Sequence, residues 1–96
     1  MNAIPTTVKV GKQPYRIQYK QRTPKTMYGS IYYDRRLIEV FKNEDPARER
    51  NTFWHELTHA ILHEMGHALV RDEAFVTEFA DKLSGAIDSA RFDKHV

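Results

Sequence analysis

The sequence predicts an α+β fold in which two β-hairpins form a small antiparallel sheet and two helices follow it. Three observations predict this class. Residues 6–41 alternate apolar and polar side chains and are rich in β-branched and aromatic residues, as strands are. Residues 46–90 instead repeat apolar side chains at helical spacing. The chain has 96 residues, which suits a single domain, residues 1–96, with one compact core.

The two hairpins are expected at about residues 6–20 and 28–41. In the first, the strands flank a glycine- and proline-containing turn at residues 11–14. In the second, they flank an aspartate and an arginine at residues 34–35. Because strands precede helices along the chain, we expect the helices to cover one face of the sheet.

The two helices are expected at about residues 46–65 and 72–90. Asp45 suits the N-cap of the first, and the proline after it suits the first helical position. Gly66 suits the position just past the C-terminus of that helix, and Asp72 suits the N-cap of the second. The predicted apolar stripes consist of Trp54, Leu57, Ile61 and Met65, and of Phe75, Val76, Phe79, Ala80, Leu83, Ile87 and Ala90.

The composition excludes several classes of protein. There is no cysteine, which excludes a disulfide scaffold, a zinc-thiolate site and a thiol nucleophile. Any metal site must therefore use His, Asp and Glu, and four of the five histidines lie within residues 55–67. No stretch approaches 18 consecutive apolar residues, and the N-terminus lacks a basic region followed by an apolar run. We expect a cytoplasmic protein that does not contact a membrane.

The charge is distributed unevenly. Residues 1–44 hold nine Lys and Arg against three Asp and Glu, whereas residues 45–96 hold six against ten. Basic strands with interleaved Tyr15 and Tyr19 could make weak nucleic-acid contacts, although a solvated sheet face is the favoured interpretation. The basic residues concerned are Lys9, Lys12, Arg16, Lys20, Arg22 and Lys25.

The first predicted helix contains His55-Glu56-Leu57-Thr58-His59, an H-E-x-x-H pattern. Residues four apart on a helix project from the same side, about 5–6 Å apart at Cβ, so both imidazoles can reach one ion. Glu56 projects about 100° away from His55, where it can reach a water rather than the ion. Two ligands from one helix leave room for a third ligand and an open position, as in catalytic zinc sites. We predict Zn²⁺ as cofactor, His55 and His59 as ligands, and Glu56 as general base.

The third ligand must come from outside this motif. His63 lies eight residues beyond His55, about 12 Å along the helix axis, which is too far to share the ion. The longer metallopeptidase pattern needs Gly and His at positions that here hold Leu62 and Met65, so that class is excluded. His67 could fold back toward the site.

Acids of the second predicted helix are the other candidates for the third ligand. Glu78 points away from the apolar stripe, toward solvent. Glu73 lies at the edge of the stripe and in the first turn, where the helix dipole favours a carboxylate. We favour Glu73. The alternatives that stay open are His67, Asp72, Glu78 and Asp81.

These segments resemble the ImmA/IrrE-type metallopeptidases and are similar to small phage-encoded proteins of that general shape. In that family a glycine, a strand, a turn and a second strand precede H-E-x-x-H-A, and residues 29–41 correspond to that segment. A downstream E-x-x-A-N-x-F-A pattern has the third ligand as its first residue, in the gluzincin manner. Glu73 matches that Glu, and Phe79-Ala80 match the closing pair. The resemblance covers residues 29–90 and implies a minimal zincin-like domain.

The resemblance also implies hydrolysis of peptide bonds in a protein or peptide substrate. A zinc-activated water would attack, and Glu56 would pass its proton to the leaving amine. An edge strand of the 28–41 hairpin could bind an extended peptide. Two alternatives stay open: a zinc-stabilised domain without catalysis, and a nucleic-acid-binding domain. The candidate donors to the oxyanion are Tyr28, Tyr32, Tyr33, His63 and His67.

Overall fold

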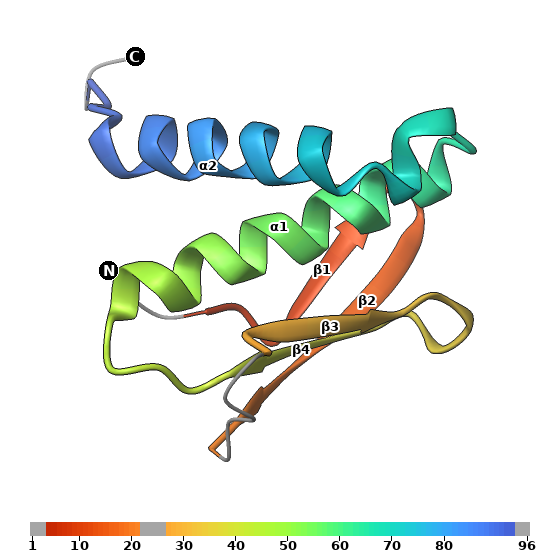
Figure 1. The fold of residues 1–96 in the computed structure, drawn as a ribbon, viewed down its shortest axis with the longest axis horizontal. Coiled ribbons are helices and arrows are strands. Elements are labelled where there is room, and N and C mark those ends of the chain that lie inside the picture. Colours follow the sequence, from red (N-terminus) through yellow and green to blue (C-terminus); the bar gives the residue numbers. More distant parts are fainter. Residues whose placement is uncertain (1–3, 22–26, 94–96) are drawn as a thin grey trace.

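A computed structural model describes residues 4–21 and 27–93 of the chain. Four strands come first and two helices follow, which confirms the predicted α+β class (Figure 1). Two short 3₁₀ turns, η1 and η2, lie between these elements. The bounds are β1 Thr7–Val10, β2 Gln13–Lys20, β3 Gly29–Tyr32, η1 Tyr33–Arg35, β4 Leu37–Phe41, α1 Pro46–Glu64, η2 Ala68–Arg71 and α2 Glu73–Ser89.

The sheet is mixed rather than wholly antiparallel, which corrects the prediction. The strand order is β1-β2-β4-β3, and both hairpins are antiparallel as predicted. However, β2 and β4 pair in parallel, because β4 rather than β3 docks beside β2. Leu37, Ile38 and Val40 of β4 are buried, whereas β3 has no buried residue. The more apolar strand of the second hairpin thus takes the inner position, and β3 becomes an edge strand.

The elements form three layers, with α1 between the sheet and α2 (Figure 1). The face of α1 that carries Phe53, Leu57 and Ala60 belongs to the core cluster on the sheet. Thr58 and Leu62, on the opposite side of α1, are also buried, and α2 packs along the same helix. The sheet contributes Val10, Tyr15, Ile17, Ile38 and Val40 to this core.

The two apolar stripes are buried only in part, which corrects the sequence-based expectation. Ile61 and Met65 are 38% and 64% exposed, because they lie on the flank of α1 between its two buried faces. Helix α2 packs against α1 and η2, so it buries a narrow row of side chains at Val76, Ala80 and Ser84. The large apolar side chains that α2 leaves exposed are Phe75, Phe79 and Ile87.

The helix termini agree with the prediction to within a residue at each end. The side chain of Asp45 accepts a hydrogen bond from the amide of Ala47, and that of Asp72 accepts one from Phe75. Gly66 follows the end of α1 with a φ of 64°, a left-handed conformation that glycine adopts at little cost. Neither helix in the described part of the chain combines the length and the apolar character that a membrane crossing requires.

Candidate metal centre

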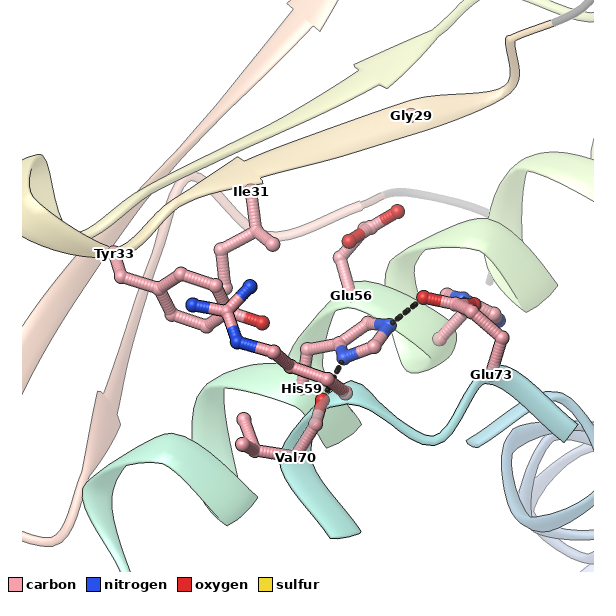
Figure 2. Close-up of a pocket in the computed structure, with 9 residues that line it drawn as sticks. Gly29, Ile31, Tyr33, Glu56, His59, Val70 and Glu73 are labelled. Atoms are coloured by element: carbon pink, nitrogen blue, oxygen red, sulfur yellow. Dashed lines mark hydrogen bonds and ion pairs between the residues drawn. The ribbon is translucent and has the colours of Figure 1, made fainter. Parts of the chain in front are cut away.

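Three side chains from α1 and α2 meet at one side of the helix pair. His55 and His59 project from the same side of α1, with ring centroids 5.1 Å apart. Glu73, the first residue of α2, reaches both: Oε1 lies 3.1 Å from His55 Nε2, and Oε2 lies 2.9 Å from His59 Nε2. Ligand atoms from the three residues lie within 4.8 Å of one another, so the group could hold a metal ion. Figure 2 shows Glu73 directed at His59 across the pocket.

The donor set fits a zinc ion. Ligand atoms about 2.0–2.1 Å from a tetrahedral zinc are about 3.3 Å from one another. The two histidine–glutamate distances, 3.1 and 2.9 Å, are close to that spacing. His59 Nδ1 lies 2.7 Å from the carbonyl oxygen of Val70. Donation to that carbonyl places the proton on Nδ1 and leaves Nε2 free as a ligand atom. Burial lowers the pKa of His55, which keeps this imidazole neutral.

Glu56 lies beside this group but points to another part of the same pocket (Figure 2). Its side chain is buried, and burial raises its pKa to about 7, with the negative charge of Glu73 adding to the shift. A carboxyl group with such a pKa can both take up and release a proton near neutral pH. The position therefore suits acid–base chemistry.

Gly29 allows β3 to pass close to α1 at this point. A Cβ atom on Gly29 would lie 2.5 Å from Thr52 Cγ2, 2.7 Å from the carbonyl oxygen of Glu39 and 3.6 Å from Glu56 Cγ. Any side chain there would push the edge strand away from the helix. The absence of a side chain at Gly29 thus allows β3, which forms one wall of the pocket, to lie next to Glu56.

The pocket encloses about 450 Å³ and is open to solvent. Tyr33, which follows β3, lines the pocket on the side of the sheet (Figure 2). Arg71, the last residue of η2, lines it as well. Burial raises the pKa of Tyr33, so its hydroxyl stays protonated and can donate a hydrogen bond. The tyrosine ring also contacts the imidazole of His63, with centroids 4.5 Å apart and ring planes 32° apart.

Comparison with known families supplies an independent assignment. Residues 10–86 match a peptidase family described as the IrrE N-terminal-like domain. The chain belongs to this family. The resemblance predicted from the sequence is thereby confirmed, and the match includes every residue that lines the pocket. Neither the curated proteins nor the solved structures give a match to the chain.

The other candidates for a third ligand have different partners in this IrrE N-terminal-like domain. His67 Nδ1 accepts a hydrogen bond from the amide of Leu69 at the start of η2. Asp72 caps α2, and Asp81 Oδ1 lies 3.5 Å from Asn51 Nδ2. Glu78 is exposed on α2. Within the described residues, the group around His55 and His59 is completed by Glu73.

The candidate oxyanion donors are also separated by the fold. Tyr33 lines the pocket that contains His55, Glu56 and His59. Tyr28 lines an adjoining hollow, and the hydroxyl of Tyr32 instead lies 3.4 Å from a Glu39 oxygen. His63 contacts the Tyr33 ring, and His67 caps η2.

The basic residues of the N-terminal strands lie away from the pocket. Lys9, Lys12, Arg16 and Lys20 are exposed, and Lys20 pairs with Glu39 at 3.6 Å. Arg22 and Lys25 lie outside the described residues. Tyr15, one of the two tyrosines interleaved with these basic residues, is fully buried and donates a hydrogen bond to Glu64 at 2.7 Å, so it is not accessible to a nucleic acid. A weak nucleic-acid contact stays a prediction.

Two parts of the pocket could not be predicted from the sequence. The Val70 carbonyl and the Arg71 side chain both come from η2, a four-residue 3₁₀ turn. A turn this short has no hydrophobic periodicity that would reveal it. Its position depends on the left-handed Gly66, a residue that the sequence does point to.

Proposed function

We propose that this chain is a zinc-dependent metallopeptidase that hydrolyses peptide bonds in a protein substrate. The observation that carries the proposal is the position of Glu56, a buried carboxyl group beside a His55, His59 and Glu73 group, in a chain that belongs to a peptidase family. A purely structural metal site has no need of an extra buried carboxyl group at its side.

His55, His59 and Glu73 are the proposed zinc ligands, in the manner of gluzincins. A bound zinc ion supplies Lewis-acid polarisation of the scissile carbonyl and a water of lowered pKa. The Val70 carbonyl holds the His59 ring in the tautomer and orientation that a ligand needs. Because Glu73 is the first residue of α2, the capped start of that helix fixes where its carboxylate can reach.

Glu56 is the proposed general base and then general acid. It removes a proton from the attacking water and delivers that proton to the leaving amine. Tyr33 is the proposed hydrogen-bond donor to the oxygen that gains negative charge. The edge strand β3 has one side without a strand partner, and an extended peptide can add to such an edge through main-chain hydrogen bonds.

The decisive experiment measures zinc content and peptide cleavage for the purified wild-type chain and for Glu56→Gln. Zinc is counted by elemental analysis, and cleavage is followed with a fluorescence-quenched peptide library. We expect one zinc per chain in both proteins and at least about 100-fold slower cleavage by Glu56→Gln. The matched control is Glu78→Gln, which changes an exposed acid on α2.

Two outcomes contradict the proposal. Absence of stoichiometric zinc in the wild type removes the metal chemistry. Full zinc with no difference between the wild type and Glu56→Gln supports instead the alternative of a metal-stabilised domain without catalysis.

A further inference from the structure

Two hollows adjoin at the candidate metal centre, and we call this pair the groove. The first, of about 450 Å³, contains Tyr33, His59, Arg71 and Glu73. The second, of about 300 Å³, contains Tyr28, Arg48 and polar side chains of α1 and α2. Both are lined by Gly29, His55 and Glu56. His55 and Glu56 therefore lie where the two hollows adjoin, with room on either side.

Each end of this groove carries an arginine that lies over a tyrosine ring. Arg71 lies 5.9 Å from the ring centre of Tyr33, and Arg48 lies 4.6 Å from that of Tyr28. Tyr28 immediately precedes β3 and Tyr33 immediately follows it. At about 3.3 Å per strand residue, the two tyrosines are about 16 Å apart, the length of about five residues of extended peptide.

Neither arginine forms an ion pair with any residue of the described segments. Other arginines do, since Arg36 pairs with Glu64 and Arg50 with Asp88. Arg48 also borders a separate hollow on its other side, and the three carboxylates there have other partners: Asp45 caps α1, Asp81 lies beside Asn51 and Asp88 pairs with Arg50.

The position of each arginine over a tyrosine prepares both guanidinium groups for an external carboxylate. A cation–π interaction over a tyrosine ring, closer at Arg48 than at Arg71, does not use the N–H donors of the guanidinium and leaves them available. Those donors match the two oxygens of a carboxylate in a bidentate arrangement. Glu56 lines both hollows and Glu73 lines the one that contains Arg71. However, these two acids are assigned to proton transfer and metal binding, and neither forms an ion pair with Arg48 or Arg71.

We propose that Arg48 and Arg71 bind carboxylates of the substrate on opposite sides of the scissile bond, so that the preferred substrate is an acidic peptide. The inference rests on the proposed peptidase function and adds its substrate class. Aspartate or glutamate side chains supply such carboxylates on both sides. A free C-terminal carboxylate could supply one of them, on the leaving-group side only.

The test uses quenched peptides built around one cleaved bond, blocked at both termini, in which Asp replaces Asn at each of the three positions on either side in turn. We expect one placement on each side to raise kcat/KM by about 10-fold or more. Arg71→Gln should remove the gain on one side, and Arg48→Gln the gain on the other. Arg35→Gln is the matched control, because Arg35 stacks on Tyr32 at 4.4 Å but lines neither hollow. Unblocking the C-terminus distinguishes a terminal carboxylate from a side chain.

A binding measurement separates this inference from the peptidase proposal. Zinc-loaded Glu56→Gln is titrated with the same peptides, and fluorescence anisotropy reports affinity without cleavage. Acidic peptides that bind more tightly, through both arginines, support the inference about substrate class. If the wild type cleaves none of these peptides, that second result contradicts the peptidase proposal and leaves the inference about binding in place. Equal cleavage and equal binding of Asp and Asn peptides overturns the inference while leaving the peptidase in place. The inference is also overturned if the arginine variants lose the same amount of cleavage and binding with the Asp peptides as with the Asn peptides.

Discussion

His59 Nδ1 lies 2.7 Å from the carbonyl oxygen of Val70, which ties the second histidine of the motif to the connection between the helices. That connection is short, and it turns back through the left-handed Gly66 and the 3₁₀ turn η2. The same turn that orients His59 therefore also delivers Glu73 to it. A few residues of chain perform both tasks, so the geometry of the centre depends on η2 as much as on the histidines.

Glu73→Gln should lower zinc affinity by about 10³-fold or more. The substitution keeps the shape of the side chain but removes the charge of the proposed third ligand, and a neutral amide is a weak zinc ligand. Competition with a chromogenic chelator measures the affinity. Glu78→Gln, five residues further along α2, is the control and should bind zinc like the wild type. Unchanged zinc affinity in Glu73→Gln, or an equal loss in both variants, would contradict the assignment.

Glu73 could be predicted as the third ligand because the features that point to it lie close to it in the sequence. A cap at Asp72, a place in the first turn and an edge position on the apolar stripe are all readable from neighbouring residues. The pairing of β2 with β4 could not be predicted in the same way. That pairing depends on which strand of the second hairpin buries more apolar surface against elements distant in sequence. Alternation of apolar and polar residues locates the strands but does not determine their order in the sheet.

Removal of zinc should lower the thermal midpoint of unfolding by at least about 15 °C. A ligand at about 1,000 times its dissociation constant stabilises the fold by about 4 kcal/mol. In a domain of this size each kcal/mol shifts the midpoint by about 4–8 °C. Differential scanning calorimetry before and after chelation measures the shift. Glu73→Gln, tested in parallel, should show little response to chelator, and a response as large as that of the wild type would argue against Glu73 as a ligand.

The zinc-free domain should lose stability as the pH rises from about 4.5 to about 7, through the titration of Glu56. The pKa of this buried group is about 7 in the fold against 4.5 as its ordinary value, so the folded state binds more protons across that window. The contribution is fully present below pH 4.5 and is lost as the pH passes 7. At 1.36 kcal/mol per pKa unit, it amounts to roughly 3 kcal/mol.

Urea unfolding of zinc-free wild type and Glu56→Gln between pH 4.5 and 8 measures this contribution. The lowered pKa of His55 acts in the opposite direction, but it is common to both proteins and largely cancels in the comparison. Glu56→Gln should gain on the wild type as the pH rises. Two curves that stay parallel would show that Glu56 is not buried as a proton-binding group.

Gly29→Ala should destabilise the domain by about 1–3 kcal/mol and slow cleavage. The new Cβ would lie 2.5 Å from Thr52 Cγ2 and 2.7 Å from a backbone oxygen that cannot move freely, so β3 must shift away from α1 and Glu56. Gly85→Ala is the matched control, because nothing lies within 4 Å of its added Cβ and it sits inside α2. That control should be neutral or more stable by up to about 1 kcal/mol. Equal stability of the two variants by urea unfolding would contradict the close approach.

The contrast between Gly29 and the basic N-terminal strands shows where sequence reasoning reaches its limit. A glycine at the start of a strand can be matched to a family pattern, but the reason for it lies in Thr52 and Glu39, which are distant in sequence. In the sequence, Tyr15 is one aromatic residue among basic ones that are exposed. In the structure, its side chain lies on the buried face of the sheet and donates a hydrogen bond to Glu64. Alternation assigns a side chain to a face of a strand, and only the packing of α1 decides which face is the inner one.

Tyr33→Phe should lower kcat by about 100-fold and leave KM and zinc content nearly unchanged. The proposed donor acts on the oxygen that becomes negative during the reaction, so its loss affects the transition state far more than the bound substrate. The ring of Tyr33 packs on His63, and phenylalanine keeps that contact. Tyr32→Phe is the control, since the Tyr32 hydroxyl lies beside Glu39, outside the pocket. Steady-state kinetics with one quenched peptide decide the matter: a rise in KM at constant kcat would make Tyr33 a substrate-binding residue instead, and no change in either constant would remove it from the mechanism.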